Sequence, residues 1–166
     1  VEIIEHKGGV PGIQVQTVQM TEPARENFLD QFTLDSQVTG FAVMGGIFGE
    51  GIDLEGDRLI GVIVVGVGLP QICPEQDQIR AYYEACNQDG FFNAYLMPGF
   101  NRVMQATGRL IRTETDRGIV ILLDERFMRQ EYTTLFPDEW LPYATVSNRL
   151  ELKENLMTFW ESENKA

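Results

Sequence analysis

Two arginines and a glutamine lie close together in one segment, Gln105-Ala-Thr-Gly-Arg109-Leu-Ile-Arg112. On a helix, Arg109 and Arg112 are three positions apart and Gln105 is four positions before Arg109, so their polar groups would converge. Guanidinium groups suit the negative charge that develops on a phosphoryl group during transfer. A pair of helical arginines is usually a solvated surface, but the rest of this segment is mostly apolar. We therefore expect an anion site here.

A glycine-rich segment, Gly45-Gly-Ile-Phe-Gly-Glu-Gly-Ile-Asp53, follows an apolar stretch directly. Its glycines allow sharp turns at the carboxyl end of a strand, where α/β folds bind ligands. Exposed backbone N–H groups in such turns can hold phosphate oxygens. The spacing is not GxGxxG, and no GxxxxGK(S/T) occurs in the chain, so neither nucleotide fingerprint is present. Taken alone, the segment is equally well a turn that only changes the chain direction.

Charged residues also follow the apolar run Gly118–Leu123, where the sequence continues Asp124-Glu-Arg126. This position again corresponds to the ligand-binding edge of a sheet. A structural salt bridge from Asp124 to Arg126 or Arg112 is favoured over a catalytic role.

Four apolar stretches predict the strands that must position these residues. Residues 13–20 alternate between apolar and polar types, which predicts an outer strand. Residues 41–44, 59–65 and 118–123 are apolar without alternation, which is typical of parallel strands covered on both faces.

Helical spacing predicts four helices between and after these strands. They extend over residues 22–32, with Thr21 as cap, from Pro74 to about Asp89, over 99–111 and over 148–161. Their expected inner residues are Ala24, Phe28, Leu29 and Phe32; Ile79, Tyr82, Tyr83 and Cys86; Phe100, Val103, Met104, Thr107 and Ile111; and Leu150, Leu152, Leu156, Phe159 and Trp160. We expect the last helix to dock on this domain. The element order predicts an α/β three-layer sandwich, with a mostly parallel sheet flanked by helices.

Composition and charge limit the classes of function. The chain has 166 residues, of which 43% are hydrophobic, so it can bury a core. Its 13 Lys+Arg and 25 Asp+Glu give a net charge of −12, so any contact with nucleic-acid phosphates must be local. Cys73 and Cys86 form no CxxC pair and His6 is the single histidine, so we expect no metal site. No run of residues is long and apolar enough to predict a membrane partner.

Two of these segments together resemble motifs of the DinG/XPD (Rad3-related) branch of superfamily 2 DNA helicases. Residues 45–56 resemble motif V, and residues 105–112 are similar to motif VI. Between them, Val64–Pro70 followed by Pro74 is similar to the connection in that family, and residues 116–126 resemble the end of its domain.

The match extends from about Thr21 to Tyr143 in the family's order. It implies a RecA-like, P-loop NTPase-type second motor domain over residues 1–147 and a helical tail over 148–166. The family's motif IV strand and helix before Ile13 are not evident, so the resemblance implies a sheet lacking its first strand. A dimer of this chain alone would then be an artefact of an exposed strand edge.

The resemblance also implies roles for individual residues. Arg109 and Arg112 would be arginine fingers that reach the γ-phosphate of ATP, with Gln105 beside it. Gly51 and Asp53 would contact the ribose and couple the nucleotide to DNA, whereas Gly45 and Gly46 would approach single-stranded DNA.

The implied partners are single-stranded DNA and the first RecA-like domain of the same polypeptide. That domain would supply the phosphate loop and the Mg²⁺ ligands for ATP. The sequence leaves open whether an iron–sulfur cluster lies elsewhere in the full-length protein. The implied location is cytoplasmic, with the nucleoid if the protein is bacterial.

Two alternatives remain. A non-catalytic α/β interaction module would keep this fold and use its acidic surface for a protein partner, but would not need both arginines. A dinucleotide-binding oxidoreductase is disfavoured because the glycine order is wrong.

Overall fold

The structure is a computed structural model that describes residues 12–48, 54, 58–111 and 116–161. The chain divides into two compact units, Val1–Arg129 and Gln130–Ala166. Each unit is described by itself. The expected boundary at residues 147/148 stays a prediction.

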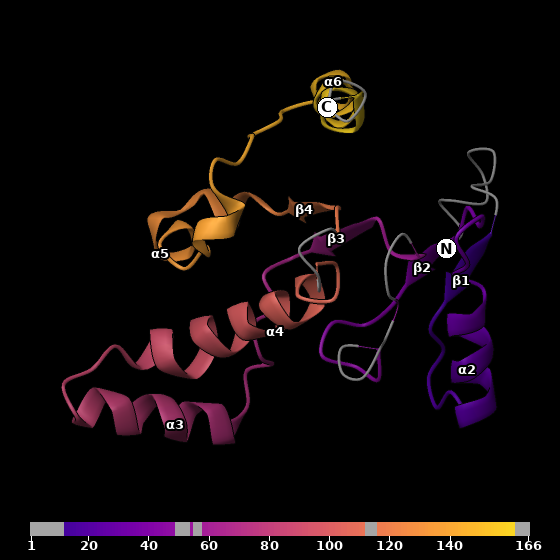
Figure 1. Cartoon of the computed structure of the whole chain (residues 1–166). Helices are drawn as coiled ribbons and strands as arrows, with labels where there is room; N and C mark the ends of the chain where they lie inside the picture. Colours follow the sequence, from indigo (N-terminus) through magenta and orange to yellow (C-terminus); the bar gives the residue numbers. More distant parts are fainter. Residues whose placement is uncertain (1–11, 49–53, 55–57, 112–115, 162–166) are drawn as a thin grey trace. The chain divides into compact units, whose positions relative to one another are not determined.

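The described strands of the first unit form two parallel pairs (Figure 1). Strand β1 (Ile13–Val15) pairs with β2 (Thr39–Phe41). Strand β3 (Gly61–Val65) pairs with β4 (Ile119–Leu123) over five residues. The parallel arrangement with flanking helices confirms the α/β class. The expected missing first strand falls on residues 1–11, which lie outside the described residues.

The predicted strand boundaries are partly wrong. The strand expected over 13–20 ends at Val15. The strand expected over 41–44 lies at 39–41 instead, because the chain already turns where Gly46 N donates to the Val43 carbonyl at 2.9 Å.

The strands are also not covered on both faces. In β3, Val64 is 4% exposed whereas Val65 is 70% exposed, and Phe41 of β2 is 41% exposed. Because side chains alternate along a strand, this pattern means that one face of β3 is packed and the other is open in the described residues.

Helix α2 (Glu22–Asp30) packs on the β1–β2 pair through aromatic rings. Phe28 and Phe32 are buried, and both rings lie against Gly40 of β2, where a Cβ would be 2.8 Å from Phe32 Cζ. Ala24 is exposed, contrary to expectation. Thr21 is at the N-cap position, as predicted, although its side chain makes no capping hydrogen bond.

Helix α3 (Pro74–Ala85) has no buried residue. The expected inner residues Ile79 and Tyr82 are 42% and 66% exposed. Asp89, expected to stop this helix, instead begins the next one, because its carboxylate accepts the Phe92 N–H at 2.8 Å.

The next helical segment contains a wider turn. Backbone from Gly90 is helical, forms the π-helical turn η2 (Phe92–Leu96) and continues as α4 (Met97–Thr107). Of the expected inner residues, Phe100, Val103 and Thr107 are buried, whereas Ile111 lies beyond the helix and is 51% exposed.

The second unit contains α5 (Gln130–Thr133), the 3-10 turn η4 (Asp138–Trp140) and α6 (Arg149–Glu161). Asn148 caps α6, since its Oδ1 accepts the N–H groups of Leu150 and Glu151 at 3.0 Å. Within this unit no residue of α6 is buried, and Leu150 is 66% exposed. The expected docking of α6 on the domain stays a prediction.

No helix in the described part of the chain has the length and hydropathy to cross a membrane.

Candidate functional site

The Gly45–Gly46 pair forms a tight turn a few residues after β2. Gly45 has a φ of +74°, a left-handed conformation that glycine adopts without strain. The side chain of Gln16 holds the turn, because its Oε1 accepts the Val43 N–H at 2.9 Å. The turn is therefore fixed to the chain just after β1.

Two side chains of this part of the chain, Phe48 within the glycine-rich segment and Leu54 just after it, are buried in one apolar cluster. The Phe48 ring stacks on Phe28 of α2, with ring centroids 4.3 Å apart. Leu54 belongs to the same cluster and is 6% exposed. Gly51 and Asp53 lie outside the described residues. The expected roles of both therefore stay predictions.

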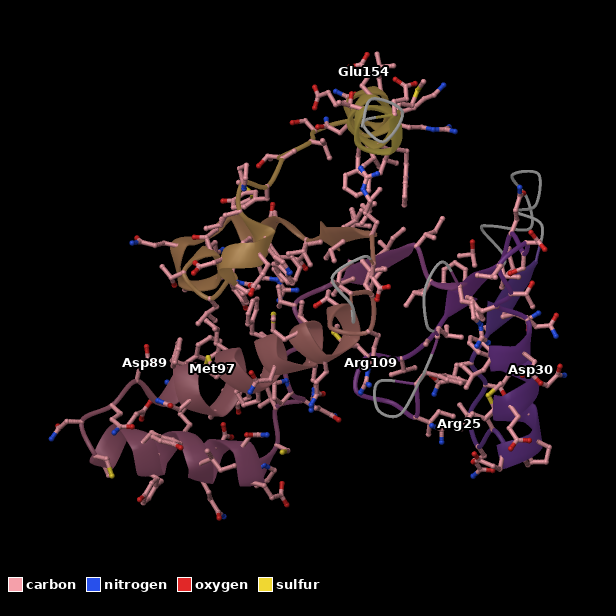
Figure 2. The ribbon with its side chains drawn as sticks, in the orientation of Figure 1. Arg25, Asp30, Asp89, Met97, Arg109 and Glu154 are labelled. Atoms are coloured by element: carbon pink, nitrogen blue, oxygen red, sulfur yellow. The ribbon has the colours of Figure 1, made fainter. Side chains whose placement is uncertain are left out.

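An open hollow of about 490 Å³ lies beside the turn. It is lined by Arg25, Gly45, Gly46 and Ile47. Arg25 comes from α2 (Figure 2) and forms a 3.8 Å ion pair with Glu22, so a cation stands next to the turn. Arg25 was not among the site residues predicted from the sequence. Its spacing from Phe28, three residues on, could have indicated that it lies close to the buried face of the helix.

Gln105 is on the exposed side of α4, but Arg109 is not in the helix. Helix α4 ends at Thr107, and Gly108–Leu110 form a turn in which Leu110 N donates to the Thr107 carbonyl at 3.0 Å. The prediction that Gln105 and Arg109 share one helical face is therefore wrong. Figure 2 shows Arg109 just past the end of α4. Arg112 lies outside the described residues.

Asp124 and Arg126 form a local pair after β4. Arg126 Nη2 and Nε lie 2.7 and 2.9 Å from the two carboxylate oxygens of Asp124, and the Arg126 backbone N–H also donates to Asp124. These bonds lower the pKa of Asp124 to about 2. The predicted salt bridge from Asp124 to Arg126 is confirmed.

Among the residues that the structure describes, no group of three or more His, Cys, Asp or Glu side chains could hold a metal ion. Cys73 and Cys86 are free thiols.

Parallel strand pairs with flanking helices and a glycine turn after β2 define a RecA-like α/β domain. Solved structures agree: the one named XPD apo matches with a TM-score of 0.60 and 21% identity, over 74% of this chain and 25% of that chain. The family model described as "Helicase C-terminal domain" matches residues 2–143. The chain therefore belongs to the helicase C-terminal domain family of the DinG/XPD type.

The chain is similar to part of each of two longer relatives. The chain is 34% identical over 103 residues to the ATP-dependent DNA helicase DinG of Photobacterium profundum, which covers 61% of this chain and 15% of the relative. It is 30% identical over 149 residues to the 3'-5' exonuclease DinG of Bacillus subtilis, which covers 87% of this chain and 15% of the relative. The chain thus spans a small part of each relative.

Proposed function

We propose that this chain is the second motor domain of an ATP-dependent DNA helicase. In this proposal it supplies arginines to ATP bound on a first RecA-like domain and holds single-stranded DNA at the Gly45–Gly46 turn. The observation that carries the proposal is the family match over residues 2–143, which contains both the glycine turn and the Gln105–Arg112 segment.

Arg109 and Arg112 are the proposed arginine fingers, and Gln105 is placed beside the γ-phosphate. An arginine supplied by a neighbouring domain contributes roughly 10³ to 10⁵ in rate, and only when the gap between the domains closes. Support comes from the location of Arg109 in a short turn at the end of α4, because a rigid helix can direct a side chain beyond its end toward another domain.

Gly45 and Gly46 are the proposed contacts to single-stranded DNA, together with Arg25. The support is the open hollow that all three line, since backbone groups and one cation suffice to contact a phosphate. Such a local site is compatible with a net charge of −12. Phosphate contacts position a strand without reading its sequence, so we expect binding without base specificity.

The phosphate loop and the Mg²⁺ ligands are proposed to lie on the first domain. Gly51 and Asp53 are the proposed ribose and coupling residues on this chain. Closing and reopening the gap once per ATP would move one domain along the strand. The proposal includes a cytoplasmic location, and it places any iron–sulfur cluster of the full-length protein outside this chain.

The test is ATP hydrolysis by the full-length protein with and without single-stranded DNA. We expect strong stimulation by DNA, and its loss in both Arg109→Ala and Arg112→Ala. Arg80→Ala is the matched control, because the Arg80 side chain forms a 2.8 Å ion pair with Glu84 on the same exposed helix, α3, and its rate should equal that of the wild type.

A wild-type protein without DNA stimulation would contradict the proposal and favour the interaction module. Stimulated hydrolysis that survives both arginine substitutions would contradict only the arginine-finger assignment. The isolated 166-residue chain should not hydrolyse ATP, since it contains no phosphate-loop lysine motif.

A further inference from the structure

Arg102 of α4 contacts two turns that are distant from it in the sequence. Its Nη1 donates a hydrogen bond of 3.1 Å to the carbonyl oxygen of Gly68, in the turn after β3. Its Cδ and Nε lie against Gly45, 3.3 and 3.4 Å from the point that a Cβ would occupy there. One side chain of α4 therefore contacts both the Gly45–Gly46 turn and the turn after β3.

The backbones around Arg102 approach each other more closely than side chains would permit. Gly68 has a φ of +67°, and a Cβ there would be 2.8 Å from the Gly99 carbonyl oxygen and 3.3 Å from Met44 Sδ. A Cβ on Gly99 of α4 would be 3.0 Å from the Val67 carbonyl oxygen. Because such close packing leaves no free space, α4 and the turn after β3 cannot shift independently, and Arg102 is the side chain of α4 that lies against Gly45.

Helix α4 also carries the residues proposed to face ATP. Gln105 is three positions after Arg102, one helical turn further on, and Arg109 follows just beyond the helix. Helix α4 thus carries both Gln105, which is proposed to contact ATP, and Arg102, whose side chain lies against the turn proposed to contact DNA. Arg102 is the side chain that joins the two.

We propose that Arg102 is the positioning residue that couples ATP turnover to the DNA-contacting turn. When α4 moves as the domain gap closes, Arg102 moves the Gly45–Gly46 turn with it. This inference rests on the proposed function. It assigns Arg102 no contact with ATP or DNA, so its effect must appear in the coupling between the two sites.

The experiment uses three variants of the full-length protein, which separate the two contacts of Arg102. Arg102→Ala removes both contacts. Arg102→Met keeps an apolar stem against Gly45 but has no N–H donor, whereas Arg102→Lys keeps a stem and a donor. The first readout is the ratio of ATP hydrolysis with and without single-stranded DNA. The second is the ratio of DNA affinities with and without a non-hydrolysable ATP analogue, because coupling between two binding sites is reciprocal.

We expect both ratios to fall about tenfold in Arg102→Ala, within the range typical of coupling between sites. Arg102→Met should fall nearly as far, and Arg102→Lys should restore most of the effect. Arg80→Ala should leave both ratios unchanged. Where the alanine variant does not fold, the Met and Lys variants are compared by the same ratios.

A purely structural role for Arg102 would lower hydrolysis with and without DNA in proportion, so the ratio would stay constant. Constant ratios in all variants, with a stimulated wild type, would overturn this inference and leave the proposed function intact. A wild type without stimulation would overturn both.

Discussion

Helices α3 and α4 follow one another in the sequence and have similar lengths, yet only α4 belongs to the core. Helix α4 buries Phe100 and Val103, at 3% and 0% exposed, whereas α3 buries none of its residues and Tyr82 is 66% exposed. Both sequences have apolar residues at helical spacing. Helical spacing therefore identifies the apolar face of a helix, but not whether other parts of the chain pack against that face.

The same difference separates the two helices in function. The turn after β3 lies directly against Gly99 of α4, and Arg102 reaches the Gly45 turn. Groups carried by a packed helix are held more precisely than groups on an exposed one. Of the proposed site residues, Gln105 lies on the packed helix and Arg109 follows directly after it.

The largest expected effect is the difference in stability lost when an aromatic side chain is truncated on α4 or on α3. Phe100→Ala should lower the free energy of unfolding of the chain by about 3–5 kcal/mol, because it leaves a cavity beneath α4. Tyr82→Ala on α3 should change it by less than about 0.5 kcal/mol, since the ring is mostly exposed. Urea denaturation followed by circular dichroism measures both. Equal losses of unfolding free energy in the two variants would contradict the conclusion that only α4 belongs to the core.

The second prediction tests the close approach of α4 to the turn after β3. Gly68→Ala should cost about 2–3 kcal/mol, because it combines a left-handed φ with a clash against the Gly99 carbonyl. Gly66→Ala is the matched control: its φ is +85°, but nothing lies within 4 Å, so only about 1 kcal/mol should be lost. Thermal unfolding of the two variants gives the difference. Identical shifts would mean that α4 can move away from the turn.

The third prediction concerns the hydrogen bond that joins α3 to the segment preceding α4. Tyr95 Oη donates to Asp77 Oδ1 at 2.9 Å, and burial raises the pKa of Tyr95. Tyr95→Phe should cost about 1 kcal/mol, since Asp77 is exposed and regains water. Tyr82→Phe should cost nothing measurable. Faster amide hydrogen exchange in α3 of the Tyr95 variant would show that this hydrogen bond holds α3 to the segment preceding α4. Unchanged exchange would contradict that role.

The smallest expected effect concerns the Asp124–Arg126 ion pair, which lies outside both helices and so gives a stability change to which theirs can be compared. The pKa of Asp124 is lowered to about 2 by Arg126, so its stabilisation is present above about pH 4 and is lost as the pH falls toward 2. Asp124→Asn should remove this pH dependence, with a loss of about 1 kcal/mol or less at pH 7 because Arg126 is partly exposed. Acid titration of both proteins measures it. If stability falls equally with decreasing pH in both proteins, the ion pair contributes nothing to stability.

The sequence predicted the class of the fold and most element positions, because apolar runs and helical spacing are local signals. It did not predict the end of α4. Arg109 continues a helical pattern in the sequence, but the helix stops at Thr107 and the chain turns at Gly108. Nor did it predict which strand faces are covered, because the exposure of Val65 depends on packing that no local pattern encodes.

The candidate site could be predicted only in part. The Gly45–Gly46 turn was evident from composition. Arg25 and Arg102 were not, since each reaches the turn from a helix distant in sequence. Nothing in the spacing of a single arginine reveals such a long-range contact.

The π-helical turn Phe92–Leu96 lies within the helical segment that continues as α4. Such a turn accommodates one residue more than an α-helical turn. Because the wider turn absorbs its extra residue, deleting one residue here and converting the turn to α-helix would leave the downstream helix in nearly the same rotational phase. Arg102 would then still face Gly45, and Gln105 would stay one turn further on. A one-residue deletion at this turn is therefore expected to be tolerated better than a one-residue deletion within α4, which would rotate the residues after it by about 100°.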